Sequence, residues 1–346
     1  MDSYPLPIID LSPSASGTAV EAIRRACEEI GFFLIKGHGV PDALIERTYA
    51  SAKAFFDLPL DEKIKIARTA EISRGYDQLG GQVLSNTLGV SAPHDLQEAF
   101  SFGPPAIGDT PYYREGFASV HFAPNRWPRR PADFQANAEA YYRAMVALSG
   151  RLMGLFALAL RLPEDFFDDK IDRQISSMRF INYPDQGAAP VPGQLRAGAH
   201  SDYGSLTILK IEDAPGGLQV RDRQGRWVDV GYVPGTFVVN IGDLMMQWTN
   251  DKWISTVHRV VNPPQVGFTR LAHSKCPISG KPEIGCDRAL GSRRISMVFF
   301  HQPNHDAEIA CLEACRSADD PPKYAPTTSG AHWRAKNAAS RARASA

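Results

Sequence analysis

Ala199-His200-Ser201-Asp202-Tyr203-Gly204 is the stretch around which the second half of this chain is organised. On an extended strand, His200 and Asp202 lie two positions apart, so both side chains point to one face. A further histidine, His258, follows after several apolar runs separated by glycine and proline. Two histidines and one carboxylate are the ligand set of a mononuclear non-haem Fe(II) site, which leaves coordination positions open for other ligands. The sequence therefore predicts an iron site formed by His200, Asp202 and His258, called here the metal triad.

Short apolar runs around the metal triad predict β-strands. Turn residues such as Pro215-Gly216-Gly217 and Asn262-Pro263-Pro264 separate these runs. The predicted strands cover residues 177–183, 206–211, 218–220, 236–241, 255–261 and 295–300. Short strands at regular spacing with turns between them are typical of a barrel or jelly roll.

The first half of the chain is expected to be mainly helical. A short strand at 7–11 and a buried strand at 31–40 alternate with helices, the second of which is expected over 41–65. Residues 108–130 read as an ordered loop, and a long amphipathic helix is predicted at about 133–162, where Pro163 ends it. The expected fold class is α+β, with a double-stranded β-helix (jelly-roll) core, flanking N-terminal helices and one long backing helix.

We expect residues 1–346 to form a single interlocked unit, because no internal repeat or low-complexity linker divides them. Within it, residues 1–170 are the mainly helical N-terminal region and 175–305 the catalytic jelly-roll core. Residues 306–346 form a C-terminal segment whose basic, alanine-rich end is expected to be a fraying helix.

Composition narrows the possible partners and the compartment. The 346 residues contain 38 Lys and Arg against 38 Asp and Glu. This neutral balance argues against a nucleic-acid-binding protein, which normally carries a basic stripe. The N-terminal residues do not resemble an export signal, and the longest apolar stretch contains arginines, which argues against a membrane span. Five cysteines, an odd number, fit a reducing cytoplasm.

Arg294 and Ser296 form a second candidate group. They lie two positions apart on a predicted strand and therefore on one face. An arginine inside a β-barrel is costly unless it meets an anion, and a guanidinium beside a hydroxyl suits a carboxylate. Without the metal triad, a surface salt bridge would be the preferred interpretation of Arg294.

In this order and spacing, the metal triad and Arg294-Ile-Ser296 resemble the isopenicillin N synthase-like group of Fe(II)/2-oxoglutarate-dependent dioxygenases. The resemblance covers nearly the whole chain. It is strengthened by the motifs Asn182-Tyr183-Pro184, Gly216-Gly-Leu-Gln-Val220, Asn240-Ile-Gly-Asp243 and Phe299-Phe-His-Gln-Pro-Asn304. The segments around His200 and His258 are most similar to microbial members, a subgroup that includes the fungal thymine 7-hydroxylase.

The resemblance implies a mechanism. Fe(II) would be bound by the metal triad, and 2-oxoglutarate would chelate it through the keto acid. The far carboxylate of 2-oxoglutarate would pair with Arg294 and Ser296, with a hydrogen bond from Tyr183. O₂ would take the remaining position, and decarboxylation to succinate and CO₂ would accompany oxidation of a small-molecule substrate. Hydroxylation is the default outcome, since desaturation or ring closure needs a different substrate pose.

Other functions remain open from the sequence. A same-fold oxidase that does not use 2-oxoglutarate is possible, because Arg294 and Ser296 do not exclude it. An enzyme that degrades 2-oxoglutarate itself to ethylene or succinate is a variant of the leading hypothesis. A non-catalytic jelly-roll binding module would not need an intact metal triad, which disfavours it. The primary substrate and the oligomeric state are not indicated by the sequence.

The segment 265–292 is longer than a tight hairpin requires. It carries His273, Cys276 and Cys286, which with Cys311 and Cys315 raise the possibility of a zinc site. Only the last two cysteines have a usual ligand-pair spacing, so a lid over the barrel mouth is the preferred interpretation. Substrate contacts are expected from this segment, from residues 74–102 and from the C-terminal segment. His38, in a glycine-flanked turn, is expected to be a local hydrogen-bonding residue.

Overall fold

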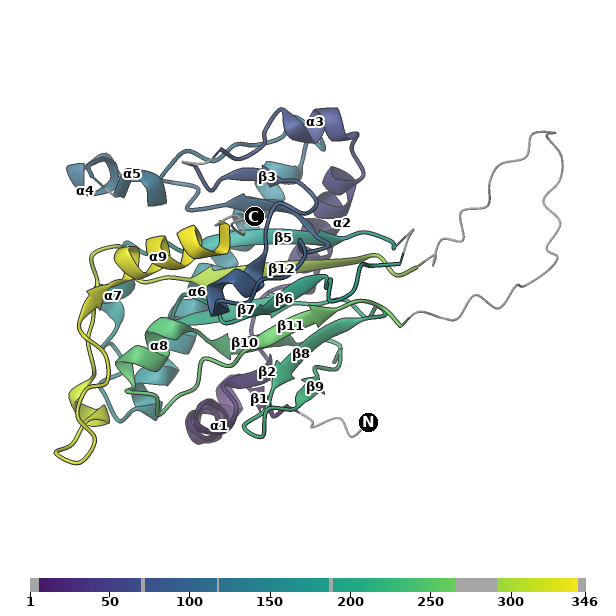
Figure 1. Ribbon diagram of the computed structural model, residues 1–346. Coiled ribbons are helices and arrows are strands. Elements are labelled where there is room, and N and C mark those ends of the chain that lie inside the picture. The colour runs from purple at the N-terminus through teal and green to yellow at the C-terminus, as the bar shows by residue number, and fades with distance from the viewer. Residues whose placement is uncertain (1–5, 70–71, 117, 187–188, 265–290, 342–346) are drawn as a thin grey trace, which may run out of the picture.

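Two β-sheets, whose inner side chains meet in one apolar cluster, form the centre of the molecule (Figure 1). The computed structural model describes residues 6–69, 72–116, 118–186, 189–264 and 291–341. The larger sheet has eight strands in the order β1 (Ile8–Asp10), β2 (Phe32–Lys36), β10 (Phe237–Ile241), β7 (Leu206–Lys210), β12 (Arg294–His301), β5 (Ser177–Tyr183), β4 (Glu98–Phe102) and β3 (Gly75–Asp77). The smaller sheet has four strands in the order β6 (Ala197–His200), β11 (His258–Val261), β8 (Gly217–Arg221) and β9 (Trp227–Asp229). A short pair, β13 (Glu308–Ile309) and β14 (Thr327–Thr328), lies apart from both sheets.

Helices come from both ends of the chain and from the loops between strands. The α-helices are α1 (Ser16–Glu29), α2 (Asp42–Phe56), α3 (Leu60–Ile64), α4 (Pro111–Arg114), α5 (Ala118–His121), α6 (Phe134–Ala159), α7 (Asp168–Ile171), α8 (Asp243–Trp248) and α9 (Ser329–Arg341). Three short 3₁₀ helices are η1 (Pro13–Ala15), η2 (Leu84–Leu88) and η3 (Glu313–Cys315). None of the helices in the described ranges is both long enough and apolar enough to cross a bilayer.

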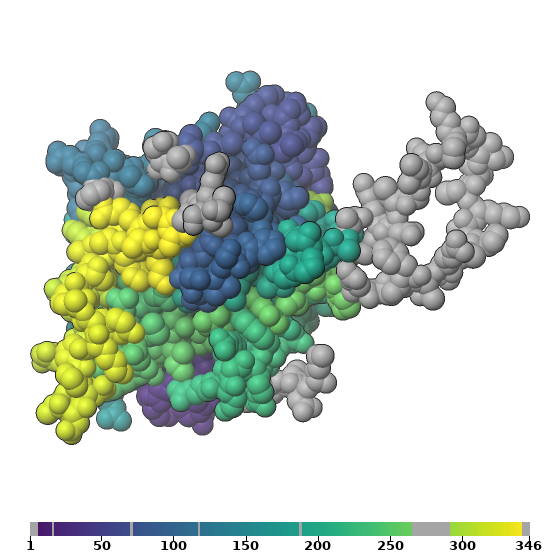
Figure 2. All heavy atoms as spheres, viewed as in Figure 1, coloured from purple at the N-terminus to yellow at the C-terminus, as the bar shows by residue number. Residues whose placement is uncertain are grey.

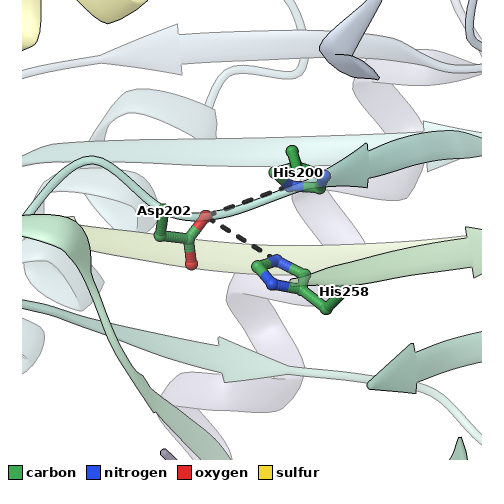
Figure 3. A group of neighbouring side chains, drawn as sticks. All are labelled: His200, Asp202 and His258. Carbon is green, nitrogen blue, oxygen red and sulfur yellow. Dashed lines mark ion pairs between the residues drawn. The ribbon is translucent and has the colours of Figure 1, made fainter. Parts of the chain in front are cut away.

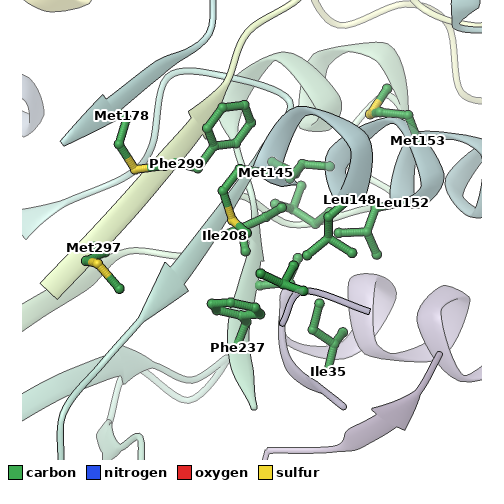
Figure 4. Packing of buried hydrophobic residues seen from close by; sticks show 14 of the residues in the cluster. Ile35, Met145, Leu148, Leu152, Met153, Met178, Ile208, Phe237, Met297 and Phe299 are labelled. Atoms are coloured by element: carbon green, nitrogen blue, oxygen red, sulfur yellow. The ribbon is translucent and has the colours of Figure 1, made fainter. Parts of the chain in front are cut away.

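The larger sheet presents a different chemistry on each face. On β12, Met297 and Phe299 pack with the long helix α6 in the main apolar core, together with Met145 and Leu152 of that helix (Figure 4). The alternate residues of β12, including Ser296, face a pocket between the two sheets. The period of two along a strand thus separates a face packed in the apolar core from a face that lines the pocket.

The expected fold class is confirmed: a jelly-roll core is joined to N-terminal helices and backed by α6. The first 170 residues are rich in helix and also supply β1 to β4 to the larger sheet, so one sheet contains strands from both halves of the chain. The boundaries predicted for the three regions stay predictions.

Several local expectations were wrong. The helix expected over 41–65 is two helices, because Pro59 cannot donate the backbone hydrogen bond that would continue α2. The strand expected from 255 begins only at His258, and residues 108–130 contain α4 and α5. Strand β9 and helix α8 were not predicted from the sequence. Each is short, and α8 follows Gly242, which is typical of a turn.

Candidate metal centre

The metal triad converges where two neighbouring strands of the smaller sheet, β6 and β11, carry a histidine each. His200 ends β6 and His258 begins β11, and the antiparallel register places these two residues directly opposite. Their Nε2 atoms lie 3.9 Å and 3.7 Å from Oδ1 of Asp202 (Figure 3). One ligand atom from each residue can be chosen so that all three lie within 4.8 Å of one another, and this is the only such metal-binding group among the described residues.

The backbone structure that positions Asp202 differs from the one that the sequence predicted. The expectation was one strand carrying both His200 and Asp202, but β6 ends at His200 and Asp202 lies in the irregular segment that leads into the bend at residues 203–205. A Cβ atom added at Gly204 would lie 2.1 Å from the carbonyl oxygen of His301, so only glycine allows this close approach. The bend, and not the pleat of a strand, directs the carboxylate toward the two imidazoles.

Each of the three side chains is fixed by a second contact. Nδ1 of His200 lies 2.7 Å from the carbonyl oxygen of Gly198, and Nδ1 of His258 lies 3.0 Å from that of Thr256. A carbonyl only accepts, so each Nδ1 carries the proton and each Nε2 keeps a lone pair for a metal. Asn240 donates from Nδ2 to Oδ2 of Asp202 at 2.7 Å, which leaves Oδ1 facing the histidines.

The environment also favours the neutral imidazole that a metal requires. Burial, reinforced by the neighbouring His258, lowers the pKa of His200 to about 4. The side chains of His200, Asp202 and His258 are 12%, 5% and 9% exposed. Near neutral pH, His200 therefore has no proton to lose before it binds a cation. The donor set, its tautomers and its burial all fit Fe(II).

The loop that carries Asp202 is held by His301 at the end of β12. The hydroxyl of Ser205 lies 2.6 Å from Nδ1 of His301, and the backbone N–H of Ser205 donates to the carbonyl of His301 at 3.1 Å. His301 is fully buried, and burial lowers its pKa to about 3.

Acidification is therefore expected to destabilise the protein through His301. The unfolded chain binds a proton as the pH falls through about 6.5, whereas the folded chain does so only near pH 3, so stability is lost as the pH falls across that interval. His301→Gln should reduce the slope of the unfolding free energy against pH by up to about 1.4 kcal/mol per unit between pH 6 and 4. Urea unfolding at several pH values measures this slope, and an unchanged slope would contradict the assignment.

The opposite wall of the pocket belongs to the larger sheet and carries the other predicted site residues. Tyr183, Arg294 and Ser296 all line the pocket and are 3%, 3% and 4% exposed. Arg294 of β12 pairs in register with Tyr183 of β5, and Ser296 lies two positions further on the same face.

The guanidinium of Arg294 is incompletely satisfied by the protein. Its Nη1 donates to the carbonyl of Gly216 at 3.3 Å, while its Nε has no hydrogen-bond partner within the described chain. Burial lowers the pKa of Arg294, which reflects the cost of a buried cation. The surface salt bridge considered for Arg294 is thus wrong, and the observed setting is one that an anionic ligand would complete.

Helix α9 closes one side of the pocket, which corrects the expectation of a fraying C-terminal helix. Trp333, Asn337 and Ser340 line the pocket, and α9 lies beside η2 on the surface (Figure 2). Lys336 forms a 2.7 Å ion pair with Asp243 of α8. Burial alone would raise the pKa of Asp243, but the nearby side chains of His332 and Lys336 outweigh it and hold the pKa at about 2. Lys336, which in the sequence belongs to the basic C-terminal segment, therefore fixes α9 to α8.

Sequence reasoning missed some pocket residues and anticipated others. Pocket residues from 74–102 and from the C-terminal segment were expected as a region, and Gln97 and Trp333 are examples. Asn240 was visible only as part of a motif, without its role beside Asp202. Arg68 and Arg179 were not singled out, because neither belongs to a recognisable motif.

The remaining candidates belong to no metal-binding group among the described residues. Nδ1 of His38 accepts a hydrogen bond from the backbone N–H of Val40 at 3.1 Å, which confirms its local role. Cys27, Cys311 and Cys315 are free thiols. The proposed lid segment, with His273, Cys276 and Cys286, lies outside the described residues apart from its last two positions.

Comparison with known proteins agrees with this geometry. Residues 175–303 match the 2OG-Fe(II) oxygenase superfamily, and residues 6–130 match the family described as non-haem dioxygenase in morphine synthesis N-terminal. A 2-oxoglutarate-Fe(II) type oxidoreductase of Emericella nidulans is 35% identical over 334 residues, covering 93% of this chain and 86% of that protein.

Solved structures give the same result over nearly the whole chain. A full-length protein of Neurospora crassa, solved in complex with alpha-KG and thymine, aligns with a TM-score of 0.77 at 27% identity, and the alignment covers 96% of both chains. A 2OG-Fe(II) oxygenase family protein from Caulobacter crescentus aligns with a TM-score of 0.79 at 27% identity, covering 97% of this chain and 99% of that one.

Proposed function

This chain belongs to the 2OG-Fe(II) oxygenase superfamily, and from that premise we propose that it hydroxylates a small organic molecule at the metal triad. The observation that carries the proposal is the convergence of His200, Asp202 and His258, with both Nε2 atoms facing one carboxylate oxygen. In this assignment the three residues hold Fe(II), and Asn240 keeps the orientation of Asp202.

The bound metal, with 2-oxoglutarate and O₂, supplies the oxidation: one oxygen atom enters the succinate formed with CO₂, and the other enters a C–H bond of the substrate. The protein residues hold and orient the reactants. The backbone carbonyls of Gly198 and Thr256 keep the protons of both imidazoles on Nδ1, so neither histidine rotates away from the metal.

We assign the cosubstrate's distant carboxylate to Arg294, Ser296 and Tyr183. Support comes from their shared position on the inward face of β5 and β12, and from the unpartnered Nε of Arg294. A carboxylate there would complete a charge-assisted pair with the guanidinium and accept from both hydroxyls. The buried setting strengthens such a pair, because little water competes for the same donors.

A small organic substrate is supported by the walls of the pocket and by the relatives. Phe300, Leu209 and Trp333 provide apolar surface near polar side chains, which is the usual lining of a small-molecule site. The Neurospora crassa protein, whose structure resembles this one, was crystallised with thymine.

We further propose that the whole chain works as one unit in the cytoplasm, without a nucleic-acid partner. Free thiols at Cys27, Cys311 and Cys315 suit a reducing compartment, and the balanced charge offers no basic stripe. The jelly-roll core at 175–305 would provide the chemistry, with the regions 1–170 and 306–346 forming its walls.

Turnover stoichiometry tests the proposal. The protein is supplied with Fe(II), ascorbate and 2-oxoglutarate and screened against small molecules, with succinate and O₂ measured together. We expect one succinate formed per O₂ consumed and a product heavier by one oxygen atom. O₂ consumption without succinate would instead indicate an oxidase that does not use 2-oxoglutarate, and ethylene in the headspace would indicate breakdown of the cosubstrate itself.

A further inference from the structure

The pocket contains more positive charge than the metal and the cosubstrate require. Among its described lining residues are four arginines, and Asp202 is the only carboxylate. Arg294 is assigned to 2-oxoglutarate and Asp202 to the metal. Arg68, Arg74 and Arg179 remain, and no lining residue neutralises them.

Two of these arginines share one anion behind the pocket wall. Nη1 of Arg68 lies 3.7 Å from Oδ2 of Asp77, and Nη2 of Arg179 lies 3.4 Å from the same oxygen. The three side chains are only 11%, 14% and 9% exposed. Two guanidiniums on one carboxylate leave a net charge of about +1 in a site with little water, which is costly unless a further anion is present.

The guanidinium of Arg179 is incompletely satisfied by the protein. Its Nε is buried and has no hydrogen-bond partner in the described residues, and its pairing with Asp77 uses one terminal nitrogen. A planar guanidinium has five donors in a fixed fork, so donors are left over for a second carboxylate. Arg74 adds charge nearby but is turned to the backbone, since its Nη2 donates to the carbonyl of His121 at 2.6 Å.

The position of Arg179 separates it from the cosubstrate site. Ser177, Arg179, Ile181 and Tyr183 alternate along β5 and all line the pocket. Tyr183 is opposite Arg294, whereas Arg179 is opposite Val298, four residues further along each strand. At about 3.3 Å per residue, this separation is about 13 Å, so one molecule of 2-oxoglutarate at Arg294 leaves Arg179 free.

We propose that the substrate of this enzyme is a carboxylic acid, bound as the carboxylate by Arg179 with Arg68, while its reacting carbon faces the metal triad. A single carboxylate matches the net charge of the two arginines and Asp77, and the fork of Arg179 matches its planar shape. This inference rests on the function proposed above and names the class of substrate for the same site.

Matched acid and amide pairs test the inference by calorimetry. The protein is loaded anaerobically with Fe(II) and saturating 2-oxoglutarate, so that the Arg294 site is filled. Phenylacetate with phenylacetamide, benzoate with benzamide and hexanoate with hexanamide are then titrated. We expect at least one acid to bind about tenfold or more tightly than its amide. Equal binding of acid and amide in every pair, or no acid binding at millimolar concentration, would overturn the proposal.

Variants test which side chains cause the preference for acids over amides. Arg179→Gln and, independently, Arg68→Gln should bring the acid-to-amide ratio toward one, with 2-oxoglutarate affinity unchanged. Asp77→Asn removes the competing carboxylate and should tighten acid binding, and weaker acid binding in that variant contradicts the proposal. Arg226→Gln is the matched control, because Arg226 also pairs with an aspartate but is 71% exposed on the surface. Thermal melts establish that each variant is folded.

The two titrations distinguish a failure of the proposed function from a failure of the proposed substrate class. A wild-type protein that fails to bind 2-oxoglutarate in the loading titration would refute the proposed function. A protein that binds 2-oxoglutarate but shows no acid preference, or keeps that preference in Arg179→Gln, would refute only the substrate class.

Discussion

Asp202→Ala is expected to abolish Fe(II) binding at micromolar concentration and to lower turnover by at least about 100-fold. Asp202 supplies the only carboxylate of the metal triad, and both histidine Nε2 atoms face its Oδ1 within 4 Å. Two neutral imidazoles cannot balance the charge of a divalent cation in a buried site, so the metal loses its anionic ligand as well as one coordinating atom. Fe(II) titration followed by succinate assay measures both effects.

The fold should survive this substitution. Without a metal, the buried carboxylate is held by one hydrogen bond from Asn240, and its removal relieves part of the cost of burying a charge. We expect the melting temperature of metal-free Asp202→Ala to remain within a few degrees of the wild type. Asp229→Ala, at the exposed end of β9 in the smaller sheet, is the matched control and should keep both iron and activity. Full iron affinity in Asp202→Ala would refute the metal triad.

Arg294→Ala is expected to raise the KM for 2-oxoglutarate by about 10- to 200-fold, with most of kcat recovered at saturating cosubstrate. The physical reason is the loss of one charge-assisted pair of about 1.5–3 kcal/mol in a buried site, where water does not replace the missing donors. Arg294 is 3% exposed, and its Nε has no partner within the described chain. Steady-state kinetics with varied 2-oxoglutarate measures the effect.

The neighbouring residue provides a control from the same part of the chain. Arg293 points to the opposite side of the chain, where its Nε donates to Oδ1 of Asn182 at 2.8 Å and its Nη1 pairs with Asp57. Arg293→Ala therefore removes the same charge without entering the pocket and should leave the KM for 2-oxoglutarate unchanged. If both variants raised this KM equally, the long-range field of the arginines would explain the effect, and the direct role of Arg294 would be wrong.

In the proposed function, the two sheets contribute different residues to the site. The smaller sheet and the bend after it provide the metal triad, whereas the larger sheet provides Arg294 and Arg179 on one face of adjacent strands. Substitutions on β5 and β12 should therefore alter which anions bind without displacing the metal. This arrangement would let substrate preference change while the histidines and Asp202 stay in place.

Much of the site followed from local patterns. The spacing of His200, Asp202 and His258 predicted a metal site, and the two-residue spacing of Arg294 and Ser296 placed them on one face. The alternation along β12 correctly separated inward from outward side chains. These features are encoded locally, because the period of two in a strand depends only on the backbone.

Tertiary structure decided which distant groups meet. Asp202 approaches the histidines through a bend that packs on His301, and α9 is fixed over the pocket by the contact of Lys336 with Asp243. Arg179 meets Asp77 because β3, β4 and β5 lie side by side in the sheet, and Arg68 meets it because a bridge between Ala67 and Tyr76 places its segment beside β3. The sequence by itself determined which side chains have metal-binding and anion-binding chemistry. The order of the strands determined which of them act together, since their energies of interaction depend on distances that no local pattern contains.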